Sequence, residues 1–325
     1  MFAPDRTTTD NGAACLFVLV LVLAVMALAA CPQDRPGAEG PRAQGAIQVE
    51  DDLHQRLVLQ RPARKIASLS PSNTEILFEL GCGDRILLRD QLSSYPAAAR
   101  ALPATNAFNL SPEHIAGFSP DLVLLSHADQ GRVAGLRRIG LAVATFDPRD
   151  LEGLYANIAT IGRLCSASTK ARETIVGLRA RIGRVRAAVR GRPRPRVYVE
   201  TDGTDPLKPW TAGKGSFVDQ LIEIAGGKNI VADLDRPFAQ ISAEEIFSRD
   251  PDVIVVMDVG GAPGTGGQRL RARTGWEDLR AVRSGRIVES IHADLLSRPG
   301  PRLVDGLELL ARALHPPRPP GTVAP

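Results

Sequence analysis

Short apolar runs alternate with helical apolar patterns from about residue 56 to residue 315. The runs predicted to be strands are Arg56–Gln60, Lys65–Leu69, Arg85–Leu88, Asp121–Leu125, Leu141–Phe146, Arg196–Val199, Val253–Met257 and Arg286–Glu289. Between them, segments 73–80, 112–117 and 130–139 are predicted to be helices. Strands that alternate with short helices favour parallel sheets covered by helices, so the predicted fold class is α/β.

Two longer helices are predicted between the two sets of strands. Their apolar stripes have members three or four positions apart. The stripes consist of Leu151, Leu154, Ile158, Ile161 and Leu164, and of Ile175, Leu178, Ile182, Val185 and Val189. We expect Ser166 or Ser168 to cap the second helix, which would span about 23 residues before the Gly- and Pro-containing run 190–196. This helix is either a surface helix of one half or a rigid strut between two halves.

The two halves of the chain repeat each other. Residues 110–125 match residues 241–256 at an offset of 131, with Ser, Glu, Ile, Pro and Asp identical. Each copy predicts a capping Ser, a short helix, Pro-Asp and a buried strand. Residues 79–86 and 223–230 form a second pair, in which a helix ends at glycine before a strand. Two similar lobes predict a cleft between them, where a ligand would bind.

The N-terminal sequence predicts an export signal. Residues 13–30 are almost unbroken apolar sequence and end in Leu-Ala-Ala before Cys31, a pattern typical of a bacterial lipoprotein lipidated at that cysteine. Asp5 and Asp10 depart from the usual positive charge of such signals, and an uncleaved signal anchor is the alternative. The segment that follows is rich in Pro, Gly, Ala and Gln, as in a flexible tether. We therefore expect a protein in the periplasm or at the cell surface, held to the membrane by lipid.

Composition excludes several classes. The 325 residues are 44% hydrophobic and 23% charged with a net charge of +4, which fits a globular protein and makes nucleic acid a poor partner. The sequence shows no dinucleotide fingerprint, P-loop, nucleophile elbow or Cys-x-x-Cys pair, so an exported enzyme is the less favoured alternative. Two cysteines of the mature chain, Cys82 and Cys165, are expected to be buried thiols, with a disulfide as the alternative.

Several motifs together resemble the periplasmic-binding proteins for vitamin B12 and iron–siderophores, most closely the cobalamin-binding members. They are Lys65–Glu75 (KIASLSPSNTE), Tyr95-Pro96, the two Ser-x-Glu-x-Ile…Pro-Asp copies, Thr211–Phe217 (TAGKGSF) and Arg298–Arg302 (RPGPR). The resemblance covers about residues 56–315. It implies two Rossmann-like lobes with parallel central sheets, joined by a single long α-helix, with a ligand cleft between the lobes.

The resemblance also implies a function. The chain would be the monomeric receptor of an ABC importer, with a permease dimer and its ATPase as partners, no resident cofactor, and cobalamin or another metal chelate as ligand. In the family, one glutamate on each lobe docks onto arginines of the permease, and the matching positions are Glu113 and Glu244. The alternative role for these glutamates is a capping box, which Glu245 would fit better from Ser242.

The cleft is expected at the C-terminal ends of the strands. Its candidate ligand-binding residues are Ser70, Ser72, Asn73, Phe108, Ser126, His127, Glu200, Asp202, Trp210, Phe238, Asp294 and Arg298. By resemblance, Phe238 and Asp294 match an aromatic and an aspartate of the B12 receptors. Positions near Leu92, Ala107 and Ser126 lack the aromatics expected there, so a corrinoid relative, a siderophore or haem remains an alternative ligand.

Two of these residues keep open roles. Arg298 could pair with an acidic siderophore or bind a helix C-terminus. His127 could be a metal ligand or an ordinary hydrogen-bonded histidine, and no pair of histidines has metal-ligand spacing.

The expected organisation has six parts. They are residues 1–30 as a lipoprotein signal peptide, 31–55 as a flexible tether, 56–150 as an N-terminal α/β lobe, 151–192 as a helical connector, 193–315 as a C-terminal α/β lobe and 316–325 as a disordered tail.

Overall fold

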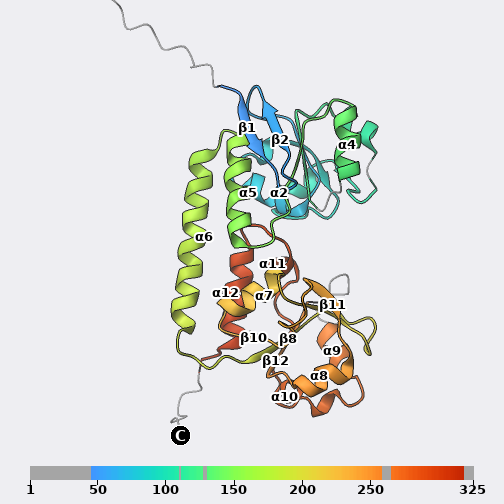
Figure 1. Cartoon of the computed structure of the whole chain (residues 1–325), viewed down its shortest axis with the longest axis vertical. Helices are drawn as coiled ribbons and strands as arrows, with labels where there is room; N and C mark the ends of the chain where they lie inside the picture. The colour runs from blue at the N-terminus through green and yellow to red at the C-terminus, as the bar shows by residue number, and fades with distance from the viewer. Residues whose placement is uncertain (1–44, 110, 127–129, 258–264, 318–325) are drawn as a thin grey trace, which may run out of the picture. The chain divides into compact units, whose positions relative to one another are not determined.

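The computed structural model describes residues 45–109, 111–126, 130–257 and 265–317 (Figure 1). The predicted signal peptide, Cys31, His127 and the first residue of the repeat, Leu110, lie outside the described residues. Within the described part, no helix combines the length and apolar character that crossing a membrane requires.

The first lobe is built on a five-stranded parallel sheet. Its strands lie in the order β5 (Ala104–Thr105), β4 (Ile86–Asp90), β3 (Ile66–Ser68), β6 (Leu122–Leu125) and β7 (Val143–Thr145). Its other elements are α2 (Pro71–Glu79), α3 (Pro112–Gly117), α4 (Gln130–Arg138) and the 3₁₀ helices η1 (Gly83–Arg85) and η2 (Ala97–Ala101). Every residue of β6 is buried, as the unbroken apolar sequence predicts for a central parallel strand.

An antiparallel hairpin precedes this sheet. It pairs β1 (Ile47–Glu50) with β2 (Arg56–Leu59), and Val49 of β1 is buried in the core. The expectation of a flexible tether up to residue 55 is therefore wrong for residues 45–55. Its physical reason is the pairing of β1 with β2, reinforced by Asp51, whose carboxylate accepts the N–H of Thr145 at 3.0 Å.

The second lobe contains a six-stranded mixed sheet. The order is β11 (Phe238–Gln240), β9 (Trp210–Ala212), β8 (Arg196–Asp202), β12 (Val253–Val256) and β13 (Ile287–Val288), and β10 (Lys228–Asn229) also pairs with β8. Its helices are α7 (Phe217–Ile224), α8 (Ala243–Arg249), α9 (Gly266–Arg271), η3 (Trp276–Asp278), α10 (Arg280–Arg283), α11 (Asp294–Ser297) and α12 (Leu303–Leu314). The predicted wholly parallel sheet is corrected here, because β9 runs antiparallel to β8 and β11 antiparallel to β9. Segment 203–209 is too short for a parallel crossover, so it closes a hairpin.

Two long helices lie between the two sheets along the chain: α5 (Leu151–Leu164) and α6 (Ser168–Val189). Figure 1 shows α6 running alongside α5 of the first lobe and α12 of the second, and α6 packs against both. The α/β class and the single long helix joining two lobes are confirmed. The predicted serine cap of α6 is wrong, because Ala167 occupies the N-cap position without a side-chain bond and Ser166 has a φ of 55°.

Ion pairs bind α6 to each lobe. Arg181 contacts Asp305 at 2.6 Å and Glu308 at 2.9 Å, both on α12 of the second lobe. Toward the first lobe, Arg179 contacts Glu152 of α5 at 2.6 Å. The strut interpretation of this helix is therefore correct.

The internal repeat is a repeat of structure. Ser111 and Ser242 each accept the backbone N–H three residues later at 3.2 Å, so they cap α3 and α8 at the same offset of 131. The offset extends to strands that the sequence comparison missed. Asp121 accepts the backbone N–H of Lys65 at 2.9 Å, and Asp252 accepts that of Arg196 at 2.8 Å.

The second repeat pair holds with its spacing changed by one residue. Gly81 follows α2 with a φ of 73°, and Gly226 follows α7 with a φ of 78°. Both helices end with the same pattern of backbone hydrogen bonds, so the two glycines occupy equivalent left-handed positions. The offset between these glycines is one residue greater than the offset of the sequence match.

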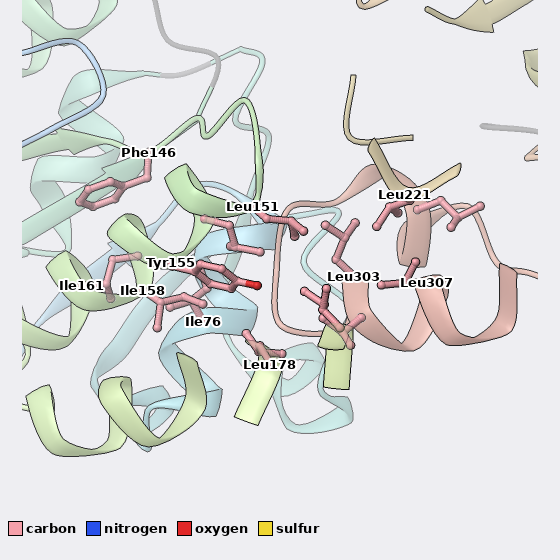
Figure 2. Packing of buried hydrophobic residues seen from close by; sticks show 14 of the residues in the cluster. Ile76, Phe146, Leu151, Tyr155, Ile158, Ile161, Leu178, Leu221, Leu303 and Leu307 are labelled. Atoms are coloured by element: carbon pink, nitrogen blue, oxygen red, sulfur yellow. The ribbon is translucent and has the colours of Figure 1, made fainter. Parts of the chain in front are cut away.

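A single apolar cluster extends through both lobes on the side of the long helices (Figure 2). It contains Ile76 and Ile158 of the first lobe, Leu178 of α6, and Leu221 and Leu303 of the second lobe. The backbone N–H of Leu151 on α5 also donates to Gln220 on α7 at 3.0 Å. The lobes are thus joined by a continuous core as well as by a helix.

Candidate functional site

A cavity of about 820 Å³ lies between the lobes at the carboxyl ends of the parallel strands. Leu69 and Ser70 line it after β3, Leu125 and Ser126 at the end of β6, and Met257 after β12. The segment 289–294 that follows β13 closes one wall. Parallel α/β sheets bind ligands at this edge, and the volume suits a small molecule of substantial size.

The cavity brings together half of the predicted ligand-binding residues. They are Ser70, Ser72, Phe108, Ser126, Asp294 and Arg298. Phe108 is 73% exposed, so its ring is free to pack on a ligand. Ser70 stands at the N-cap of α2 without making a side-chain capping bond.

Asn73 does not line the cavity but supports it. The side chain is 1% exposed and its amide donates to the backbone oxygen of Leu125 at 2.9 Å. Leu125 is a wall residue at the end of β6. Asn73 therefore orients the wall from inside the first lobe.

Glu200 and Asp202 do not line the cavity either. Glu200 is buried in a two-fold ion pair with Arg273, with distances of 2.6 and 2.9 Å. Asp202 accepts the hydroxyl and backbone N–H of Thr204 at 2.6 and 2.8 Å, and these bonds lower the pKa of its carboxyl. Both carboxylates serve the local structure of the second lobe. They were predicted as ligand-binding residues because they lie at the end of β8, where a cleft is expected. At this point, however, β8 turns back into the antiparallel strand β9.

Trp210 and Phe238 lie on the outer strands β9 and β11. Trp210 is 44% exposed and Phe238 is 51% exposed, and neither is part of the cavity wall. The antiparallel β9–β11 pair carries them away from the parallel strand ends. The correspondence of Phe238 with a ligand-packing aromatic of the B12 receptors is therefore not supported by its position.

Several wall residues were not predicted from the sequence: Asp90, Met257, Glu289 and His292. Met257 directly follows β12, so the expectation that ligands bind at the C-terminal ends of parallel strands could have identified it. Asp90 accepts the backbone N–H groups of Leu92 and Ala107 at 2.9 and 3.1 Å, and so shapes two further parts of the wall. The spacing of residues in the sequence does not predict those two hydrogen bonds.

The polar end of the cavity is organised by Asp294 and Arg298. Their side chains are 2.9 Å apart, and Arg298 also donates to the backbone oxygen of Leu92 in the first lobe at 3.2 Å. Burial lowers the pKa of the Arg298 guanidinium. Arg298 therefore links the two lobes across the cavity.

A buried clasp lies next to this end. Glu75 of α2 accepts the backbone N–H of Arg302 at 2.9 Å and its Nε–H at 2.8 Å, and the guanidinium lies 3.6 Å from the centre of the Tyr95 ring. A Cβ at Gly300 would come within 2.9 Å of the Glu75 carboxylate, so a larger residue at this position would displace that carboxylate. Burial raises the pKa of Glu75 against the opposing effect of Arg302. The clasp joins two motifs of the sequence, Lys65–Glu75 and Arg298–Arg302.

The two glutamates expected to dock are exposed and lie in the first turn of α3 and of α8. Glu113 accepts the Ser111 hydroxyl at 3.2 Å, whereas Glu245 pairs with Arg249. The capping-box alternative is half present, because Ser242 accepts the backbone N–H of Glu245 but the carboxylate of Glu245 turns to Arg249. Glu113 and Glu244 therefore occupy equivalent surface positions on the two lobes.

The histidine and carboxylates on the described part of the wall are not grouped as a metal site. In the described ranges, no three His, Cys, Asp or Glu side chains are grouped closely enough to hold a metal ion. His292 is the described histidine of the wall, and its Nδ1 accepts the backbone N–H of Asp294 at 3.2 Å. In the neutral ring the proton therefore lies on Nε2.

Comparison with known proteins gives consistent matches. The profile of a family described as periplasmic binding protein matches residues 66–291, more than half of the chain. An uncharacterized ABC transporter substrate-binding lipoprotein of Bacillus subtilis, YvrC, is 27% identical over 308 residues, covering 91% of this chain and 95% of its own. A cobalamin-binding protein of Halobacterium salinarum is 28% identical over 317 residues, covering 93% and 84%.

The fold has solved counterparts. A periplasmic heme-binding protein, RhuT of Roseiflexus sp. RS-1, superposes with a TM-score of 0.70 at 29% identity, covering 78% of this chain and 98% of that one. The solved heme-binding protein shares the fold of this chain, whereas the relative from Halobacterium salinarum is named for cobalamin.

Proposed function

Because the chain belongs to the periplasmic binding protein family, we propose that it is the lipid-anchored substrate-binding subunit of an ABC importer and that cobalamin or a related corrinoid binds between its lobes. Family membership makes it an extracytoplasmic binding protein rather than an enzyme. The observation that carries the ligand proposal is the interlobe cavity, together with the cobalamin-binding relative that matches 93% of the chain.

The charge of the wall supports an uncharged, amide-rich ligand. The described wall carries the carboxylates Asp90, Glu289 and Asp294 and the guanidinium groups Arg132 and Arg298. A ferric siderophore with several negative charges would meet no surplus of positive charge on these residues. Hydroxyl and carboxylate groups on the same wall suit the amide side chains of a corrinoid.

Haem is the second candidate, since His292 and Met257 line the cavity and both residue types ligate haem iron. Ligation through Nε2 of His292 would require the ring to give up its bond from Asp294 or lose a proton. Haem therefore ranks below a corrinoid.

Calorimetric titration with cobalamin, cobinamide, haem and a ferric siderophore tests the ligand. We expect the corrinoids to bind most tightly and Phe108→Ala to weaken them about tenfold or more. Trp210→Ala is the matched control, because it removes an exposed aromatic away from the cavity. Tightest binding of haem or the siderophore would refute the corrinoid, and no binding by any of the four would refute the ligand class.

We further propose that Glu113 and Glu244 dock onto the permease. Their equivalent, exposed positions on two similar lobes fit a partner with two similar subunits. The double change Glu113→Ala and Glu244→Ala should leave ligand affinity intact and abolish uptake in cells. Glu173→Ala with Glu277→Ala removes the same charge from exposed positions elsewhere and should transport normally. Normal uptake by the first double variant would reject the docking role.

The membrane anchor is proposed at Cys31. Cys31→Ser should release the exported protein from the membrane fraction, whereas retention after that change would favour the uncleaved signal anchor.

A further inference from the structure

The outer surface of the connecting helix α6 carries a ridge of small and apolar side chains. Val176, Ala180, Gly183 and Ala187 recur three or four positions apart, so they follow one line along the helix. All four are exposed, and Val176 is 67% exposed. Figure 1 shows α6 at the outer edge of the described residues. A flat partner could therefore approach this helix closely.

Arginines flank this ridge over the last part of α6. Arg184 lies on one side of the ridge and Arg186 and Arg190 lie on the other, as the 3.6-residue turn of the helix dictates, and all three are exposed. The acidic residue of the helix, Glu173, lies near its start. Among the described residues, none of these three arginines forms an ion pair, whereas Arg181 is paired with two carboxylates of α12.

The positive charge continues past the end of α6. Arg192 and Arg194 are exposed, and their guanidinium groups donate to the backbone oxygens of His315 at 3.3 Å and Gly227 at 2.8 Å. A neutral carbonyl oxygen holds a guanidinium group in place without cancelling its charge. The arginines of this surface together form what we call the basic face: Arg184, Arg186, Arg190, Arg192 and Arg194.

A cavity of about 870 Å³ adjoins the basic face at the base of the second lobe. Four arginines supply guanidinium groups to its wall: Arg192, Arg194, Arg280 and Arg286. On the described wall the carboxylate is that of Asp252, which already accepts the backbone N–H of Arg196 at 2.8 Å and a guanidinium N–H of Arg280 at 2.9 Å. Prolines and a leucine complete much of the wall. The cavity thus suits a phosphate group that is attached to a partly apolar molecule.

These features fit the headgroups of an anionic bilayer. A guanidinium group binds phosphate through two parallel hydrogen bonds, and arginines near an anionic bilayer each add to the attraction. Small and apolar residues flanked by arginine are also typical of helices that lie at a bilayer surface. An acidic protein would offer the same charge, but a lipid anchor makes the bilayer the surface that this chain meets at high local concentration.

We propose that the basic face binds the headgroups of anionic phospholipids and holds α6 against the membrane while the chain is away from the permease. This inference rests on the anchor part of the proposed function. Residues 31–44 span at most about 50 Å when fully extended, so an anchor at Cys31 keeps the described residues within reach of the bilayer.

Binding to lipid leaves the proposed contact of the second lobe with the permease free. Figure 1 places α8, the helix that carries Glu244, on the side of the second lobe away from α6. The attraction between exposed charges is screened by salt and falls off within a short distance of the surface. The chain therefore leaves the lipid surface readily when it docks.

Fluorescence quenching on vesicles tests this orientation. The full chain with Ala180→Cys is reconstituted through its anchor and labelled with a fluorophore, while the free thiols of Cys82 and Cys165 are protected by burial. A nitroxide on the lipid headgroups quenches the label at close range. We expect strong quenching in mixed phosphatidylglycerol and phosphatidylcholine vesicles, weak quenching in phosphatidylcholine alone, and loss of the difference in high salt. The same label on Ser248→Cys, an exposed position of α8, should be quenched equally in both lipids.

Charge variants of the labelled chain identify the residues responsible. Each arginine at an anionic surface strengthens association about fivefold, so Arg184→Gln, Arg186→Gln and Arg190→Gln together should weaken it about 100-fold. Quenching should then fall to the level of neutral vesicles. Ala187→Glu is an independent variant that places a negative charge on the ridge, where pairing with arginines three positions away supports the helix. It should also reduce quenching in the anionic vesicles.

A matched triple variant controls for total charge. Arg138→Gln, Lys208→Gln and Arg236→Gln remove three positive charges from exposed positions on α4 and next to β9 and β11, and should leave quenching unchanged. Equal quenching in anionic and neutral vesicles, or equal loss in both triple variants, would overturn the proposal. Absence of quenching in the anionic vesicles would also overturn it and leave an acidic protein as the partner of this face.

Flotation of the same samples separates this inference from the anchor. An anchored chain floats with neutral as well as anionic vesicles, whereas failure of the anchor proposal would show as a chain that does not float with neutral vesicles. In that case, flotation with anionic vesicles that the change of Arg184, Arg186 and Arg190 abolishes would still support the basic face. Flotation with neither kind of vesicle would overturn it.

Discussion

The buried pair of Glu200 and Arg273 provides a sharp test of the site assignment. Both side chains are almost fully buried, at 3% and 8% exposure, and two bonds of 2.6 and 2.9 Å join them. Arg273 also donates to the backbone oxygen of Gly203 at 3.0 Å and lies 4.5 Å from the centre of the Trp276 ring. The sequence placed Glu200 in the ligand site, whereas the structure places it in the interior of the second lobe.

The change Glu200→Gln removes one charge and leaves the guanidinium buried without its counter-charge. Such a loss costs about 3–5 kcal/mol of unfolding free energy. At roughly 2–4 °C per kcal/mol for a chain of this size, the midpoint should fall by about 6–20 °C. Ligand affinity should change little, because Glu200 lies outside the cavity wall.

The exposed pair of Arg179 and Glu152 is the matched control. Its distance is also 2.6 Å, but its side chains are 56% and 75% exposed. Glu152→Gln should therefore cost no more than about 1 kcal/mol. Changing Glu200→Gln together with Arg273→Met should recover much of the loss, because no uncompensated charge then remains.

Urea unfolding followed by circular dichroism, beside calorimetric titration with cobalamin, measures both quantities on the same variants. Unchanged stability together with a tenfold or greater loss of affinity for Glu200→Gln would refute the reasoning and return Glu200 to the ligand site.

Three further predictions concern the same framework. Burial raises the pKa of Glu75 above its ordinary value of 4.5, so the folded state binds this proton more tightly than the unfolded chain does. The free energy of unfolding should therefore fall as the pH rises from 4.5 through the folded pKa. Glu75→Gln should remove that decline from pH-dependent unfolding curves, and an unaltered curve would contradict the prediction. Gly203→Ala should destabilise the protein in thermal unfolding, because its Cβ would collide with the carboxylate of Glu200 and the guanidinium of Arg273, and a wild-type midpoint would show that the pair adjusts freely. Ligand should reduce the radius of gyration only slightly in solution scattering, because α6 and a continuous core join the lobes. A large contraction on ligand binding would refute this prediction.

The sequence predicted the lobes well because their signals are local. Apolar runs such as Leu122–Leu125 are buried parallel strands, and the repeat at an offset of 131 is reproduced in the caps Ser111 and Ser242. The mixed sheet was missed for a physical reason. Strands β9 and β11 are three residues long, and their direction depends on the hairpin after β8 rather than on their own pattern.

The strand ends predicted part of the site correctly where a strand leads straight to the cavity. Ser70 and Ser126 follow β3 and β6 and line the cavity. Glu200 and Asp202 also lie at a strand end, but their side chains bond to Arg273 and Thr204. The sequence spacing does not predict these two partners. The Glu75–Arg302 clasp was missed for the same reason, since its two members lie 227 positions apart.

The scarcity of aromatic residues acquires a structural meaning. Phe108 supplies the phenyl ring on the described part of the wall. Tyr198 and Trp276 fill the interior of the second lobe. Tyr95 packs against the guanidinium of Arg302. Stacking by several rings therefore cannot carry most of the affinity at these positions. The polar groups must do more, and Asp294 is already held by Arg298, which is itself fixed to the opposite lobe. A ligand that bonds to Asp294 thus meets a group oriented before it arrives, which lowers the entropy lost on binding.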